Sequence, residues 1–248
     1  MKELSLQKIF LFTFVLSVFS LAETMQIDYK ASFGIFGTVG TLKTQLTQED
    51  DKYEIVASIN LSGIAKMLLS GHTEKHISKG HIVKGIMISD SYEMIQKEKG
   101  KLTRKRYYIN HQSKAVLKTT KKWKNGKLVQ NKKERLKFYA KDDLLTLYFN
   151  LGKNVQKKGE TYTFKAVGLE KQEGKVNISI ANKEQESYYI QYLGAGAALY
   201  AKAFIYQKNF RKKKGNIFIS FAKDGFIENT VIKDILLYGD AKIARSKK

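Results

Sequence analysis

The chain has 248 residues, a formal net charge of +22, and neither cysteine nor proline. Its composition excludes a disordered polymer, because 43% of the residues are hydrophobic and 14 Tyr and 14 Phe are among them. The lack of cysteine excludes disulfide bonds, so a packed core must hold the fold, and the length suits a single large all-β domain.

The N-terminal segment, residues 1–22, is predicted to be a cleavable secretory signal peptide. Lys2 and Lys8 form a basic start, an apolar stretch follows, and the small-x-small sequence SLA at 20–22 forms a cleavage site. The apolar stretch is shorter than the roughly 20 residues that a membrane-spanning helix needs, so we expect no transmembrane span after cleavage near Glu23. We therefore expect an exported protein in the periplasm of a Gram-negative bacterium; a retained N-terminal anchor is the alternative.

The rest of the chain, residues 23–248, is predicted to form one β-rich envelope domain. Segments that alternate apolar and polar residues, as half-buried strands do, include KYEIVASIN, TYTFKAV, KVNISI and NIFISF. Asn125-Gly126 separates two such runs and predicts a tight hairpin, because both residues tolerate a positive φ. Roughly ten to thirteen strands with short connections favour a single curved antiparallel sheet, either a meander or roll or a partly open barrel.

One segment, residues 142–151, breaks the strand pattern and predicts a short buried helix. Its apolar residues recur at helical spacing, at Leu144, Leu147, Tyr148 and Leu151. Asp142 or Asp143 stands where a carboxylate caps a helix N-terminus, and Gly152 stands where a left-handed C-terminal cap belongs. A catalytic acid/base pair is the alternative for the two aspartates, but neighbours at a helix start point in different directions, which favours the cap.

The histidines raise the question of a metal site. His72, Glu74 and His76 alternate, so a strand places them on one face, and His81 follows shortly after. Three of these side chains could reach one zinc ion. The spacing matches no helical zinc-binding pattern, and imidazoles on a polar strand face commonly meet water, so these four remain weak candidates and we predict no metal.

Patterns for catalysis and for cofactor binding are missing from the sequence. There is no nucleophile elbow and no cysteine. The Gly-rich segment 193–204 lacks the spacing of a phosphate-binding loop or of a dinucleotide fingerprint. We therefore predict no catalytic residues and no cofactor.

The band of basic and aromatic residues at 102–124 is the best candidate for ligand binding. Arg104, Arg106 and Tyr108 share one strand face, and Lys122 and Trp123 lie on the following hairpin arm. Arginine suits phosphate and carboxylate groups, and an aromatic ring can flank a lipid or a sugar. The alternative is a solvated outer face whose lysines discourage aggregation.

Four stretches in this order resemble a family of exported bacterial proteins called domain of unknown function 3108. They are residues 27–42, 77–94, 142–152 and 216–246. The resemblance implies an exported, β-dominated protein in which a curved antiparallel sheet surrounds a buried helix. It brings no established catalytic residues to carry over.

These observations predict a non-catalytic factor that binds an amphiphilic or anionic component of the cell envelope, such as a lipid or a polysaccharide. Its basic surface would attract such a partner through a long-range field. Export makes nucleic acid an unexpected partner. The alternatives are a scaffold that contacts other envelope proteins, an outer-membrane β-barrel and a hydrolase.

Overall fold

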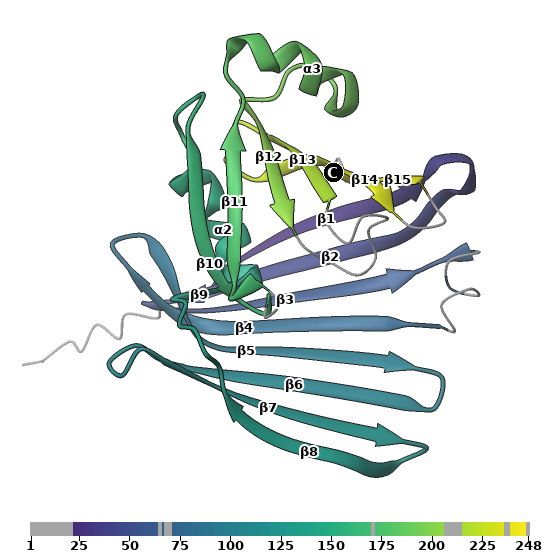
Figure 1. The fold of residues 1–248 in the computed structure, drawn as a ribbon, viewed down its shortest axis with the longest axis vertical. Coiled ribbons are helices and arrows are strands. Elements are labelled where there is room, and N and C mark those ends of the chain that lie inside the picture. Colours follow the sequence, from purple (N-terminus) through teal and green to yellow (C-terminus); the bar gives the residue numbers. More distant parts are fainter. Residues whose placement is uncertain are drawn as a thin grey trace, which may run out of the picture.

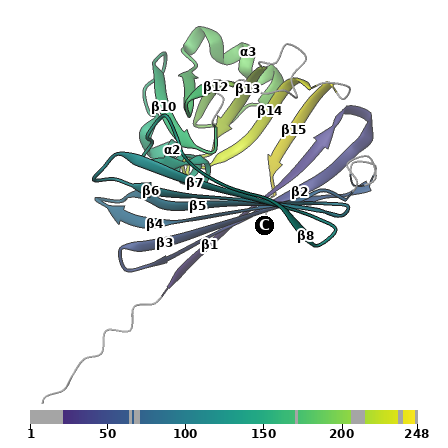
Figure 2. The same cartoon turned by 60° about the horizontal axis from the view of Figure 1, so that its bottom comes forward.

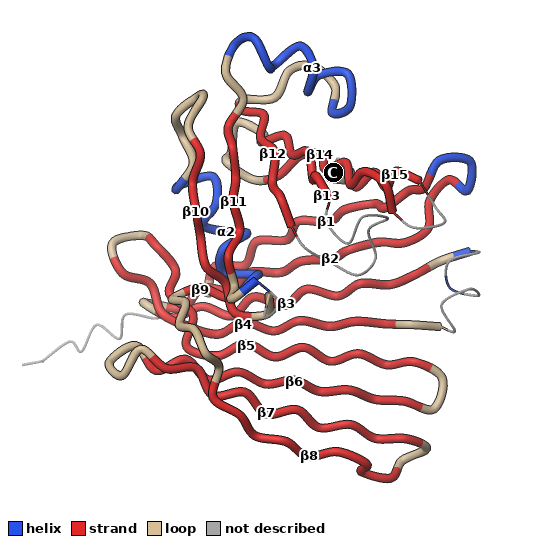
Figure 3. Tube along the Cα trace, in the orientation of Figure 1, coloured by secondary structure: helices blue, strands red, loops and turns tan. Residues whose placement is uncertain are grey.

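The computed structural model describes residues 22–63, 66, 71–169, 172–205, 215–235 and 239–246, so nearly all of the predicted signal peptide lies outside the described residues. The described part is mostly β, with one 3-10 turn, η1 (Gly34–Phe36), and two short helices, α2 (Leu144–Asn154) and α3 (Lys183–Leu193). Figure 3 shows how few helical segments interrupt the strands. Among the described residues, no helix is long and apolar enough to cross a membrane.

The fifteen strands in the described residues form one sheet (Figure 1). In chain order they are β1 (Glu23–Phe33), β2 (Gly37–Glu49), β3 (Lys52–Leu61), β4 (Thr73–Val83), β5 (Ile86–Glu98), β6 (Lys101–Asn110), β7 (Ala115–Lys124), β8 (Lys127–Arg135), β9 (Asp142–Asp143), β10 (Thr161–Val167), β11 (Lys175–Ile180), β12 (Leu199–Ile205), β13 (Gly215–Phe221), β14 (Ile227–Ile235) and β15 (Gly239–Arg245). Their spatial order runs β8-β7-β6-β5-β4-β3-β2-β1-β15-β14-β13-β12-β11-β10-β9.

The sheet is largely antiparallel, as predicted. The parallel pair found in the described part joins the two-residue strand β9 to β10. The predicted hairpin at Asn125-Gly126 is confirmed: it joins β7 to β8, and both residues have a positive φ, of 48° and 78°. This agrees with the tight turn that the dipeptide predicts.

A β-bulge in β5 allows the sheet to curl back on itself without closing. Lys79 pairs with Ser91 but the next residue, Gly80, pairs with Ser89, so Asp90 is an extra residue. Bulges bend a strand and increase its twist. The backbone N–H of Ser89 donates instead to the carbonyl oxygen of Lys141, 3.1 Å away, directly before β9.

The contact between β9 and β5 divides the sheet into two regions. We call β6, β7 and β8 (residues 101–135) the wing, because they continue beyond the point where β9 meets β5. The remaining strands, with α2 and α3, form the body. Figure 1 shows the wing strands extending past β5, and Figure 2 shows α2 between the two parts of the curved sheet.

Helix α2 lies on the concave face of the sheet and fills the body. Leu147 and Leu151 pack with the inner faces of β10–β13, whereas Phe149 packs with those of β1–β5. The prediction of one short buried helix near 142–151 is therefore confirmed, with its bounds moved to 144–154. A helix between two parts of a sheet must be apolar on most of its sides, as this sequence is.

The second helix, α3, was not predicted and covers the opposite face of the sheet. Tyr189 and Leu193 pack against Phe218 and Val231 of β13 and β14. The side chain of Asn182 caps its N-terminus in a capping box with Gln185. Most of its other residues are polar, so the sequence carries no strong helical periodicity.

Gly152 does not cap the C-terminus of α2, which corrects the sequence prediction. The helix continues through Asn154, and Val155 is its C-cap. Gly152 is instead required by a close backbone approach, because a Cβ atom placed there would lie 2.0 Å from the carbonyl oxygen of Gly225. The glycine lets α2 touch the β13–β14 connection.

Candidate functional site

The positive charge of the chain is concentrated in the wing. Residues 101–135 contain thirteen Lys and Arg and a single carboxylate, Glu134, which gives a net charge of +12 out of +22. Residues 1–100 contain eleven cations and eleven anions, and residues 142–205 contain eight and seven. A lysine-rich composition spread over the whole chain would not produce this contrast, so the wing is the candidate site.

Strand register divides the wing residues between two faces. Direct antiparallel partners share a face, and the partners here are Arg104 with Lys121, Tyr108 with Leu117 and Leu102 with Trp123. This is the outer face, opposite the face on which Tyr107, Ile109 and Val116 are buried. Four of the five predicted binding residues, Arg104, Arg106, Tyr108 and Trp123, therefore lie on one face.

Lys122 does not belong to this group. It pairs with Thr103 of β6, whose side chain points to the inner face of the wing. The alternation of side chains along β7 thus separates Lys122 from its neighbours Lys121 and Trp123. Register on β8 adds two other cations to the outer face, because Lys133 pairs with Thr119 and Arg135 pairs with Leu117.

The two arginines of the outer face are held by one carboxylate on β5. The Nε of Arg104 lies 2.8 Å from an oxygen of Glu93, and an Nη of Arg106 lies 3.2 Å from the same oxygen. Arg106 also donates to the hydroxyl of Tyr108 over 3.4 Å, and these hydrogen bonds raise its pKa. Because two guanidinium groups share one carboxylate, the arrangement orients both and leaves one net positive charge.

Exposed apolar side chains stand at both ends of this cationic face. Tyr108 and Leu117 are 48% and 43% exposed at one end, and Leu128 is 52% exposed beside Trp123 at the other. The six residue steps from Leu102 to Tyr108 separate the two ends by about 20 Å at the rise of a strand. The outer face of the wing is therefore amphiphilic, with cations between two apolar ends.

The four candidate metal ligands are not assembled into one site. His76 and His72 contact separate oxygens of Glu74, at 2.6 and 3.2 Å. His81 lies apart and contacts Asp90 at 3.0 Å. Within the described ranges, no three His, Cys, Asp or Glu side chains are arranged to hold a metal ion.

Hydrogen bonding accounts for the ionised state of the Glu74 carboxylate without a metal ion. Burial opposes its ionisation, but hydrogen bonds from His76 and Gln96 outweigh the burial and lower its pKa to about 2. The amide nitrogen of Gln96 donates to Glu74 over 2.8 Å, and Nδ1 of His76 lies 2.5 Å from the hydroxyl of Tyr92. The cluster lies on the inner face, away from the amphiphilic outer face.

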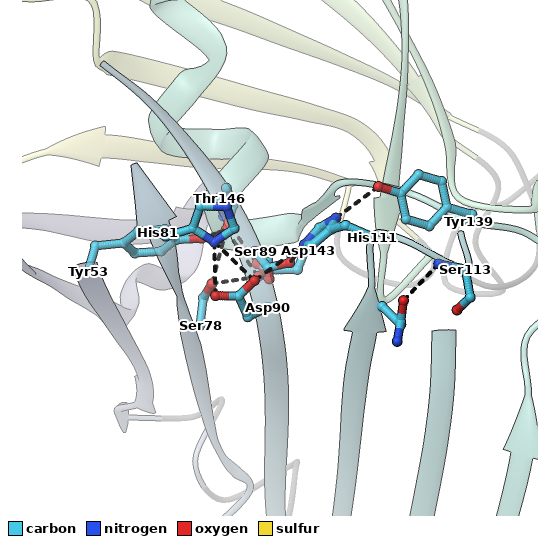
Figure 4. A network of polar contacts seen from close by, with 11 residues as sticks. Tyr53, Ser78, His81, Ser89, Asp90, His111, Ser113, Tyr139, Asp143 and Thr146 are labelled. Atoms are coloured by element: carbon cyan, nitrogen blue, oxygen red, sulfur yellow. Dashed lines mark hydrogen bonds and ion pairs between the residues drawn. The ribbon is translucent and has the colours of Figure 1, made fainter. Parts of the chain in front are cut away.

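Asp143 caps α2 and also ties the helix to two strands of the body (Figure 4). One carboxylate oxygen accepts from the backbone N–H groups of Leu145 and Thr146, at 2.7 and 3.1 Å. The other accepts from the hydroxyls of Ser78 and Ser89, each at 2.5 Å, and of Thr146 at 3.0 Å. The predicted cap is confirmed, and every lone pair of this buried carboxylate is directed at a structural partner.

Asp142 has a different environment from that of its neighbour. Its backbone pairs with Ala166 of β10 and its side chain is fully buried. Burial raises its pKa to about 6, and the charge of Asp143 adds to this effect. Its Oδ1 has no hydrogen-bond partner, so the ionised form is poorly supported.

A second polar group fastens the wing to the body beside this network (Figure 4). His111, in the turn between β6 and β7, has one ring nitrogen 2.8 Å from the hydroxyl of Tyr139 and the other 3.0 Å from the carbonyl oxygen of Ser89. Asp90 lies 3.3 Å from His111 and 3.0 Å from His81. These contacts use the carbonyl and the extra residue that the β5 bulge exposes.

The geometry thus defines a class: a β-rich protein built on one unclosed, largely antiparallel sheet, with a separate cationic wing. No family model matches the chain, and no curated protein matches it, so the resemblance to domain of unknown function 3108 is not confirmed. Among solved structures, it is similar to the β-barrel-like protein of domain of unknown function 1849 from Brucella abortus. The TM-score is 0.45 at 9% sequence identity, and the match covers 92% of this chain and 97% of the other.

Proposed function

We propose that the protein is an exported, non-catalytic binding factor of the cell envelope, and that the outer face of the wing binds an anionic lipid surface. The observation that carries this proposal is the net charge of +12 in residues 101–135, beside residues 1–100 that carry no net charge. Such a field attracts anionic surfaces over a distance comparable to the Debye length, about 8–10 Å at physiological salt.

The apolar ends of the wing favour a lipid over a fully polar polyanion. Tyr108 with Leu117 and Trp123 with Leu128 can enter the boundary between headgroups and acyl chains while the cations between them contact phosphate. An acidic polysaccharide would use the cations alone. The ion pairs with Glu93 hold Arg104 and Arg106 in place before a ligand arrives, which reduces the entropy that binding costs.

The test uses Trp123, which is the single tryptophan of the chain and lies on the outer face of the wing. Purified protein is titrated with vesicles of phosphatidylglycerol and phosphatidylethanolamine, with vesicles of phosphatidylcholine, and with alginate as a soluble acidic polysaccharide. We expect the emission of Trp123 to shift to shorter wavelength only with the anionic vesicles, and added salt to reverse the shift.

Two matched double variants distinguish binding by the wing from a general effect of the protein's positive charge. Lys121→Gln with Lys133→Gln removes two cations of the wing, and each is worth about 1 kcal/mol at an anionic surface, so the affinity should fall by roughly 30-fold. Lys165→Gln with Lys175→Gln removes two exposed cations that face each other on β10 and β11, and it should leave the affinity unchanged. Equal losses in both variants, or an equal response to alginate, would contradict the proposal.

A further inference from the structure

The edge strand β8 (Lys127–Arg135) is the one long open edge of the sheet in the described residues. It stands at one end of the strand order and pairs with β7, and its other side faces no further strand within the described part. The opposite end, β9, has two residues and is bonded into the body. An edge strand presents unpaired N–H and C=O groups to which another extended chain can bond.

We propose that β8 binds an extended acidic polypeptide segment as an additional antiparallel strand. Main-chain hydrogen bonds would supply the affinity, and the alternating side chains would select the partner. A β-bulge at Val129, where pairing with β7 shifts between Lys122 and Trp123, limits the regular part of the edge to residues 130–135. The occupant is therefore a segment of about six or seven residues, because strand pairing is one residue to one residue.

The charge of β8 argues for an acidic occupant. The strand carries Lys127, Lys132, Lys133 and Arg135 against one carboxylate, Glu134. That carboxylate is already paired, because Lys132 lies 2.6 Å from one of its oxygens and Lys118 lies 3.2 Å from the other. Carboxylates on an added strand would stand directly beside Lys133 and Arg135 on the outer face, where opposite charges across strands are favourable.

The same charges argue against a second copy of this chain as the occupant. Two β8 strands placed side by side would bring eight cations and two carboxylates into one ladder, and like charges across strands are destabilising. The other edge of a second copy cannot take this place, because β9 is only two residues long. Lysines on an edge strand discourage indiscriminate pairing, while an acidic segment is not repelled.

The experiment uses a fluorescent peptide of sequence ETEVETE, with blocked ends, and measures its binding to the full protein by anisotropy. Two derivatives carry N-methyl groups on alternate residues, one set on the even and the other on the odd positions. A strand added to an edge uses the N–H groups of one side only, so we expect one derivative to bind as the parent does and the other to bind roughly tenfold or more weakly.

Hydrogen exchange and charge variants supply the remaining readouts. The peptide should slow exchange of alternate amides of residues 130–135, and Lys133→Gln with Arg135→Gln should weaken binding, whereas Lys165→Gln with Lys175→Gln should not. A KTKVKTK peptide should not bind.

Two results would overturn the proposal. Equal binding of both methylated derivatives would show a charge contact without strand addition. A dimer in sedimentation would identify a second copy of the chain as the occupant. Lipid binding by the outer face does not need the free backbone edge of β8. The vesicle titration and the peptide experiment can therefore succeed or fail independently of each other.

Discussion

The wing and the body belong to one sheet, yet they treat ionisable side chains in opposite ways. In the body, carboxylates such as Glu74, Asp142 and Asp143 are withdrawn from water and most are surrounded by hydrogen-bond donors. In the wing, Arg104, Arg106 and most lysines remain open to solvent. We therefore expect changes to the body's charges to alter stability and changes to the wing's charges to alter binding to a partner, because buried polar groups are costly to disturb and exposed ones are not.

The largest expected effect comes from Asp143→Ala in the body. The substitution removes the cap of α2 and leaves the hydroxyls of Ser78, Ser89 and Thr146 buried without their acceptor. We expect the free energy of unfolding to fall by about 3–5 kcal/mol. Urea denaturation followed by circular dichroism measures this loss. Asp143→Asn keeps an acceptor for the helix N-terminus and should lose less; an equal loss in the two variants would contradict the role given to the cap.

A smaller loss is expected for Gly152→Ala, where α2 meets the β13–β14 connection. The new Cβ would lie 2.0 Å from the carbonyl oxygen of Gly225, so one of the two backbones must move. We expect a cost of about 2–3 kcal/mol, measured by the same denaturation. Lys153→Ala, one residue along the same helix, should cost less than about 1 kcal/mol. A neutral Gly152→Ala would mean that the helix and the connection do not approach so closely.

Asp142→Asn, also in the body, is expected to raise the stability of the protein rather than lower it. The pKa of Asp142 is raised from 3.8 to about 6, so the folded state holds the proton more tightly than the unfolded state does. The free energy of unfolding of the unmodified protein therefore falls as the pH rises from about 4 to 6, because ionising Asp142 is costlier in the folded state than in the unfolded state. This loss is present in full above about pH 6. The asparagine variant avoids it and should be more stable by about 2–3 kcal/mol at pH 7.5, with no difference below pH 4. Denaturation at the two pH values checks this, and a constant difference would refute it.

The smallest expected effect on stability is that of the wing variant Lys121→Gln with Lys133→Gln. Both side chains lie on the outer face and neither is buried, so the free energy of unfolding should change by less than about 0.5 kcal/mol. Thermal denaturation beside the vesicle titration shows whether binding and stability separate. A large loss of stability would mean that the wing's cations hold the sheet together.

Local signals in the sequence predicted the elements that depend on local physics. The apolar spacing of Leu144, Leu147 and Leu151 identified the buried helix, and the pair Asp142 and Asp143 marked its start without deciding which of the two is the cap. Asn125-Gly126 identified the hairpin of the wing, because a positive φ is a property of the residues themselves. The alternating runs identified most of the strands for the same reason.

What escaped prediction depends on contacts between distant residues. Ser78 and Ser89 are ordinary polar residues in strand sequences, and only the fold brings their hydroxyls to Asp143. Gly152 stands in the sequence where a C-terminal helix cap is expected, but its actual role depends on its close approach to Gly225, far along the chain. Helix α3 buries few of its residues, so it leaves little periodicity in the sequence, and the face of Lys122 could be assigned only from the register of the strands.

The extra residue in β5 has a consequence for the whole of the wing. Met87 and Ser89 before it and Tyr92 after it all point inward, although strict alternation from Ser89 would turn Tyr92 outward. Each later strand takes its orientation from the one before it. Asp90 therefore decides which face of the wing points outward: without this extra residue the buried apolar side chains of the wing would face water, and Arg104, Arg106 and Lys121 would point to the inner face.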